Sequence, residues 1–173
     1  MFPSLREPQE NSGYTKEVQG RFLRLFIVMQ SLAVELASFP ENEREIIHFG
    51  EWSLKDILSH FIGWNEITSQ NIRTFISNEG EIDWIPDDQI DDFNASWVEK
   101  LSGMTWDKVY EHFIKSFVDL WATYLDIPPD RLNDQLGPEE GDTPCKSLLV
   151  DISHIMDHLK EITEKCQMLQ IEG

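Results

Sequence analysis

Two histidines four residues apart, His154 and His158, are the first feature of this sequence that could do chemistry. In a helix this spacing places both imidazoles on one face, one turn apart, where they can bind a single metal ion. The zinc peptidases that share the spacing carry a glutamate directly after the first histidine, and here that position is Ile155. The pair therefore indicates metal binding without indicating a peptidase.

A third candidate ligand, His60, lies in an earlier helical segment. His60, His154 and His158 each fall beside the apolar stripe of their expected helix, so two such helices could bring all three to one edge of a bundle. Three neutral imidazoles suit zinc, nickel, iron and copper alike, and they leave positions open for water or substrate. The alternative is that the three are incidental residues on solvated helix faces. His48 and His112 are expected to be plain surface residues.

Four residues near the histidines could support such a site. Asp151 and Glu161 lie three residues from the nearest histidine, and either carboxylate could accept a hydrogen bond from an imidazole. Trp64 could form a wall of the site, and Asn94 could approach it from a long loop. Each also has an ordinary interpretation: solvated acids, simple core packing for Trp64, and a helix cap for Asn94.

Four long helices are expected to position these residues. Apolar residues recur at steps of three and four over about 15–39, 53–77, 105–125 and 143–169. Ser53 predicts the start of the second helix, and Thr143 followed by Pro144 predicts the start of the last. Residues 81–102 predict a long acidic loop with a short helical piece near 93–101, and a loop of this length could cover a site. No segment shows sustained strand alternation.

These helices predict an all-α fold, because amphipathic helices bury their apolar faces against one another. We expect a single domain over residues 14–173, a four-helix bundle of the up-down-down-up or up-down type. Residues 1–13, with two prolines and a glycine among polar residues, predict a flexible N-terminal tail. Six tryptophans and ten phenylalanines supply large apolar side chains for the core.

Composition limits the classes of partner. The formal net charge is −18, from 32 acidic and 14 basic residues, which argues against binding to nucleic acid or to an anionic membrane surface. The N-terminus does not look like a signal peptide, and the longest apolar stretches are too short to span a bilayer. Cys145 and Cys166 form no metal or redox spacing motif and are expected to be reduced thiols. We therefore expect a cytoplasmic protein that acts on a small molecule.

Two segments resemble the DinB-like superfamily. Residues 52–64 (WSLKDILSHFIGW) resemble the start of that superfamily's second helix, and residues 154–162 (HIMDHLKEI) resemble its last-helix motif. The Thr143-Pro144 lead-in also fits, and helix order and loop placement agree over nearly the whole chain. The specific motifs are these two segments.

The resemblance implies a four-helix bundle, often dimeric, so a homodimer is a possible assembly. Many members hold nickel, zinc or an iron-like ion on three histidines, which by position are His60, His154 and His158. Some members transfer low-molecular-weight thiols such as bacillithiol or mycothiol, or isomerise a substrate with mycothiol, and others protect against a reactive small molecule. The resemblance thus implies a metal-dependent transferase or hydrolase acting on a small electrophile. The alternatives are a non-catalytic binding or protective bundle, and a structural or partner-binding bundle without metal.

Overall fold

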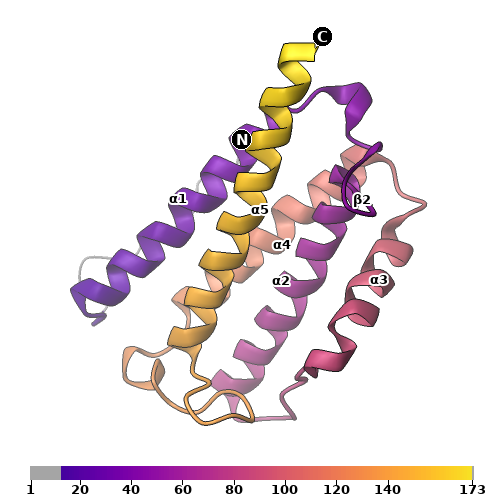
Figure 1. Cartoon of the computed structure of the whole chain (residues 1–173). Coiled ribbons are helices and arrows are strands. Elements are labelled where there is room, and N and C mark those ends of the chain that lie inside the picture. Colours follow the sequence, from indigo (N-terminus) through magenta and orange to yellow (C-terminus); the bar gives the residue numbers. More distant parts are fainter. Residues whose placement is uncertain (1–12, 173) are drawn as a thin grey trace.

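The computed structural model describes residues 13–172, so the predicted tail at 1–13 lies almost entirely outside the described residues. Helices make up most of the described part, which confirms the all-α prediction (Figure 1). The α-helices there are α1 (Lys16–Ser38), α2 (Leu54–Ser77), α3 (Ile90–Leu101), α4 (Trp106–Leu125) and α5 (Pro144–Glu172). Single turns of 3-10 helix lie at η1 (Glu41–Glu43), η2 (Asp87–Gln89) and η3 (Pro129–Arg131). No described helix has the length and apolarity that crossing a membrane requires.

A small antiparallel hairpin precedes α2, where the sequence predicted only a loop. Strand β1 (Ile47–Phe49) pairs with β2 (Trp52–Ser53) across a turn that contains Gly50. Gly50 adopts a φ of 65°, which a residue with a side chain rarely does. The strands are too short to produce a visible alternation of apolar and polar residues, which is why the sequence pattern did not reveal them.

Helix α2 begins at the predicted cap. The Ser53 side chain accepts a hydrogen bond from the backbone N–H of Asp56 at 3.2 Å, and the Asp56 carboxylate accepts one from the backbone N–H of Ser53 at 2.9 Å. This reciprocal pair satisfies two amides that the first turn would otherwise leave unpaired. It fixes the start of the helix less than two turns before His60.

Helix α5 also begins where the sequence predicted. The Thr143 hydroxyl accepts from the backbone N–H of Lys146 at 3.1 Å, and Pro144 occupies the first position of the helix. The helix then continues to Glu172, three residues beyond the predicted end. His154 and His158 therefore lie in the middle of a long helix, far from either fraying end.

The acidic segment before α4 contains more helix than the sequence predicted. Residues 90–101 form the complete helix α3 rather than a short piece at the end of a loop. Asp91 and Asp92 lie in its first turn, where carboxylates stabilise the positive end of the helix dipole. A Cβ on Gly63 of α2 would lie 2.5 Å from Cδ1 of Trp97 in α3, so the glycine lets the two helices approach closely.

The long helices pack as α1 against α5 and α2 against α4, with α3 packed on α2 (Figure 1). Large apolar side chains from α1, α2, α4 and α5 fill the space between them, including Phe22, Leu32, Phe61, Phe113, Phe117, Leu148 and Ile162. Trp64, for which the sequence also allowed simple core packing, is only half-buried. All four helices contribute to this core, and His60 lies on α2 while His154 and His158 lie on α5.

Candidate metal centre

The three predicted ligands lie together. His60 comes from α2, and His154 and His158 come from successive turns of α5. One ligand nitrogen from each lies within 4.8 Å of the other two, a spacing that could hold a metal ion. The closest approach is 2.7 Å, between Nε2 of His60 and Nε2 of His154. His60 is 6% exposed, and the other two are half-buried.

Aromatic rings surround the cluster. The Phe61 ring centroid lies 5.1 Å from those of His154 and His158, and the Trp52 ring lies 5.0 Å from that of His60. Phe61 belongs to the core stripe of α2 and is 1% exposed, so it forms an apolar floor beneath the two α5 imidazoles. Phe61, the core residue next to His60, thus provides an apolar environment where His60 lies against α5.

The cluster is electrically neutral near pH 7. Burial, followed by the charge of neighbouring His158, lowers the pKa of His60 to about 4. Burial, followed by the charges of the other two histidines, lowers the pKa of His154 to about 3. Burial also lowers the pKa of His158, while the Glu161 carboxylate opposes that shift. Neutral imidazoles keep the lone pairs that metal binding requires.

Asn94 and Trp64 determine which nitrogen of His60 carries its proton. The indole N–H of Trp64 can only donate, and it donates to Oδ1 of Asn94 at 2.9 Å. The same oxygen lies 2.9 Å from Nδ1 of His60, so Nδ1 must be the protonated nitrogen. The lone pair of His60 is therefore on Nε2, the atom that faces His154. Such a hydrogen bond to the far side of an imidazole orients a ligand and raises its basicity.

Glu161 lies beside His158. Its Oε2 is 3.3 Å from Nδ1 of His158, within ion-pair distance. The angles do not make a hydrogen bond, so Nδ1 of His158 is a buried atom without a hydrogen-bond partner among residues 13–172. The Glu161 side chain is 59% exposed. A small rotation would let it accept from Nδ1 and leave the other ring nitrogen of His158 as a ligand.

Asp151 takes a different position from the one predicted. Its Oδ2 accepts a hydrogen bond from the Tyr124 hydroxyl at 2.6 Å, whereas the sequence left open an acceptor for an imidazole or a solvated acid. Tyr124 belongs to α4, so the contact depends on how α4 packs against α5 and could not be inferred from spacing along one helix. Asp151 faces a second cavity, described below.

The donor set fits a divalent cation. Zinc–imidazole bonds are about 2.0–2.1 Å long, so tetrahedral ligand nitrogens lie about 3.3 Å apart. Here Nε2 of His60 and Nε2 of His154 are 2.7 Å apart, and one ligand nitrogen from each of the three histidines lies within 4.8 Å of the others. Side-chain shifts of about an ångström would bring the three nitrogens to this spacing. With three neutral imidazoles and His60 already oriented, the site has the chemistry that a metal requires.

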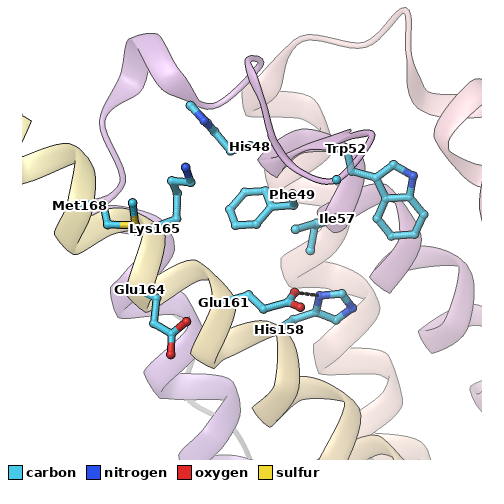
Figure 2. A pocket seen from close by; sticks show the side chains of 10 residues that line it. His48, Phe49, Trp52, Ile57, His158, Glu161, Glu164, Lys165 and Met168 are labelled. Carbon is cyan, nitrogen blue, oxygen red and sulfur yellow. Dashed lines mark ion pairs between the residues drawn. The ribbon is translucent and has the colours of Figure 1, made fainter.

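A cavity of about 540 Å³ opens beside His158 (Figure 2). The hairpin and the C-terminal half of α5 form its walls, and it is lined by His48, Phe49, Trp52, Ile57, His158, Glu161, Glu164, Lys165 and Met168.

His48 was predicted to be a plain surface residue, but it lines this cavity and pairs with Glu43 at 2.9 Å. Gly50 was the one feature that could have indicated the hairpin. His112 lies away from the site and pairs with Glu66 at 2.8 Å.

Comparison of the chain with protein-family models, with curated proteins and with solved structures finds no match. The resemblance of residues 52–64 and 154–162 to the DinB-like superfamily therefore stays a prediction from the sequence. What the structure contributes independently is the geometry of the histidine cluster and its surroundings.

Proposed function

We propose that this protein is a divalent-metal-dependent enzyme of the DinB-like type that transfers a thiol to a small electrophile or hydrolyses it. The observation that carries the proposal is the convergence of His60, His154 and His158 from two helices onto one point. A zinc, nickel or iron-like ion bound there would lower the pKa of a water or thiol and so supply a nucleophile near neutral pH.

The surrounding residues would prepare the site for this chemistry. Asn94 holds the His60 proton on Nδ1, and Phe61 and Trp52 exclude water from the imidazoles. The cavity beside His158 has the size of a small-molecule site. Lys165, Glu161 and Glu164 offer it charged groups of both signs, and Phe49 offers an apolar surface (Figure 2).

The arrangement of helices supports the proposed fold type. Long helices α1 and α5 pack together, as do α2 and α4, which is the pairing of a four-helix bundle with α3 added at the edge of α2. We place the protein in the cytoplasm, with a possible homodimer as its assembly. The scarcity of basic residues supports a small-molecule substrate rather than a nucleic acid.

The second candidate function is a binding or protective module that sequesters a small molecule without turnover. It is favoured by a second cavity, of about 330 Å³, which Trp64 helps to line. That cavity includes Trp64, Trp84 and aliphatic side chains in its lining and could retain a ligand without a metal. A structural bundle with incidental histidines is the least favoured alternative, because incidental residues would have no reason to converge.

An activity screen distinguishes the two candidates. The protein would be loaded with zinc, nickel or iron and assayed with a chromogenic aryl ester for hydrolysis and with an aryl halide plus a small thiol for transfer. Metal-dependent turnover that is lost in His158→Ala but retained in His112→Ala is the expected result. Bound metal without turnover on either substrate would favour the protective module, and equal turnover in the two variants would refute the proposal.

A further inference from the structure

The second cavity lies between α2, the segment before α3, and the loop that leads into α5. Its walls include Trp64, Ile67, Trp84, Leu136, Val150 and Asp151. Trp64 also contacts the histidine cluster, both through Asn94 and through its ring, whose centroid lies 6.3 Å from that of His60. The volume, about 330 Å³, is at the lower end of the range for small-molecule sites.

Specific contacts hold these walls in place. The Asn71 side chain forms two hydrogen bonds with the backbone of Asp83, at 2.8 and 2.9 Å, and so fixes the segment that carries Trp84. A Cβ on Gly137 would lie 3.0 Å from the Trp84 ring and 2.8 Å from the Asp142 carboxylate. The glycine therefore allows the ring to pack directly on the backbone of the loop. Trp84 is nevertheless 42% exposed, so part of its surface is available to a ligand.

Asp151 is a partly buried carboxyl in the lining of this cavity. The Tyr124 hydroxyl, a neutral group, donates to one of its oxygens at 2.6 Å. Among residues 13–172, no lysine, arginine or histidine nitrogen lies within ion-pair distance of Asp151. Burial raises the pKa of this carboxyl to about 7. A cation bound in the cavity would stabilise the ionised form of the Asp151 carboxyl.

The rest of the lining also favours a cation. The acidic residues that line the cavity with Asp151 are Asp83, Asp87, Glu139 and Asp142, whereas Lys146 is the one basic residue in the lining. Lys146 is already paired with Asp142 at 2.6 Å. The two tryptophans add ring surfaces, which attract cations as well as apolar groups. The cavity thus combines apolar ring and aliphatic surfaces, a partly buried carboxyl without an ion-pair partner and an excess of acidic residues.

We propose that this cavity is a binding site for a small organic cation, an ammonium group attached to a flat apolar body. The ammonium group would pair with Asp151, and the apolar body would lie against Trp64, Trp84 and the aliphatic side chains. The site would not depend on a metal at the histidines. Ligand binding in this cavity would influence the histidine cluster through Trp64, because the indole N–H of Trp64 donates a hydrogen bond to Asn94.

The test uses 2-phenylethylamine as the cationic probe and 3-phenylpropionate as a probe of similar shape and opposite charge. Binding at pH 7.5 would be followed through the indole N–H signals of Trp64 and Trp84 in NMR spectra. We expect saturable shifts with the amine, affinity at least tenfold weaker in Asp151→Asn, and unchanged affinity in Asp130→Asn, an exposed acid outside the cavity. Asparagine can still accept from Tyr124, so the substitution keeps the local hydrogen bond.

Three results would overturn the proposal: no saturable shift with the amine, equal binding of the carboxylate, or unchanged affinity in Asp151→Asn. Should that variant fail to fold, Trp84→Ala replaces it, because the ring is partly exposed, and unchanged affinity there would overturn the proposal equally. Repeating the titration with His158→Ala separates this site from the proposed metal centre. The His158→Ala variant should still bind 2-phenylethylamine, whether or not the proposed metal chemistry is correct.

Discussion

Nε2 of His60 lies 2.7 Å from Nε2 of His154, although 94 positions separate the two residues in the chain. At this distance one nitrogen donates and the other accepts. Because Asn94 requires the His60 proton on Nδ1, Nε2 of His60 must accept and Nε2 of His154 must carry a proton when no metal is bound. A metal ion between the rings would need both lone pairs and would therefore displace that proton.

This relationship predicts the tautomers of both rings. In metal-free protein at pH 7.5, we expect His60 as the Nδ1–H tautomer and His154 as the Nε2–H tautomer. Adding zinc should leave His60 unchanged and move the His154 proton to Nδ1. Long-range ¹⁵N–¹H spectra distinguish the two tautomers directly. An Nε2–H tautomer for His60 would contradict the role assigned to Asn94.

Asn94 should matter to metal binding without being a ligand. In Asn94→Leu the hydrogen bond to Nδ1 of His60 is lost, so His60 is no longer held in the binding tautomer. We expect zinc affinity to fall by about 10- to 100-fold, the usual cost of removing a partner that orients a metal ligand. Competition with a chromogenic chelator measures the change. Ser96→Ala, an exposed position on the same helix, serves as the control and should bind zinc normally.

Asp151 should make stability depend on pH. Its pKa is raised to about 7 in the folded protein from an ordinary value of 3.8, so between these values the folded state keeps a proton that the unfolded state loses. Stability is therefore lost as pH rises from about 4 to 7, by at most about 4 kcal/mol at about 1.4 kcal/mol per pKa unit. Asp151→Asn should match wild type at pH 4 and be more stable at pH 8.

Urea denaturation of both proteins at the two pH values tests this prediction. The comparison with the variant is necessary because His60 and His154, whose pKa values are lowered, change stability in the opposite direction. They protonate in the unfolded state below about pH 6.5, so their effect destabilises the folded protein as pH falls. A difference between wild type and Asp151→Asn that does not change with pH would show that Asp151 has an ordinary pKa.

Gly63 should be needed for the position of α3. A Cβ there would lie 2.5 Å from the Trp97 ring, so Gly63→Ala should push α3 away from α2 and move Asn94 away from His60. We expect a loss of about 1–3 kcal/mol of stability, as for overpacking elsewhere, together with weaker zinc binding. Gly20→Ala in α1 has nothing within 4 Å of the new Cβ and should instead stabilise by about 0.5–1 kcal/mol. Thermal melts and zinc titrations of both variants provide the comparison.

The sequence was sufficient to predict the long helices and the histidine cluster. Apolar periodicity and the caps at Ser53 and Thr143 placed the starts of α2 and α5 correctly. The same periodicity placed His60, His154 and His158 beside the core stripes of their helices. When two helices bury these stripes against each other, the positions beside the stripes can also meet. The position of each histidine beside the apolar stripe follows from spacing along its own helix, so the sequence alone was enough to predict it.

Contacts that depend on how one helix is rotated against another could not be predicted from the sequence. The hydrogen bond from Tyr124 to Asp151 depends on the rotation of α4 relative to α5, which no single-helix pattern contains. The full length of α3 was missed because its acidic residues resemble those of a loop, although Asp91 and Asp92 in a first turn are typical of a helix start. The hairpin was too short to show alternation.

The metal content of the protein tests the central claim most directly. Wild type, His158→Ala and His112→Ala would be purified without chelator or nickel resin, incubated with zinc or nickel, desalted and measured by elemental analysis. We predict about one divalent ion per chain in wild type and in His112→Ala, and none in His158→Ala. Equal metal content in wild type and His158→Ala, or no metal in any of the three proteins after loading, would contradict the assignment of His60, His154 and His158 as a metal centre.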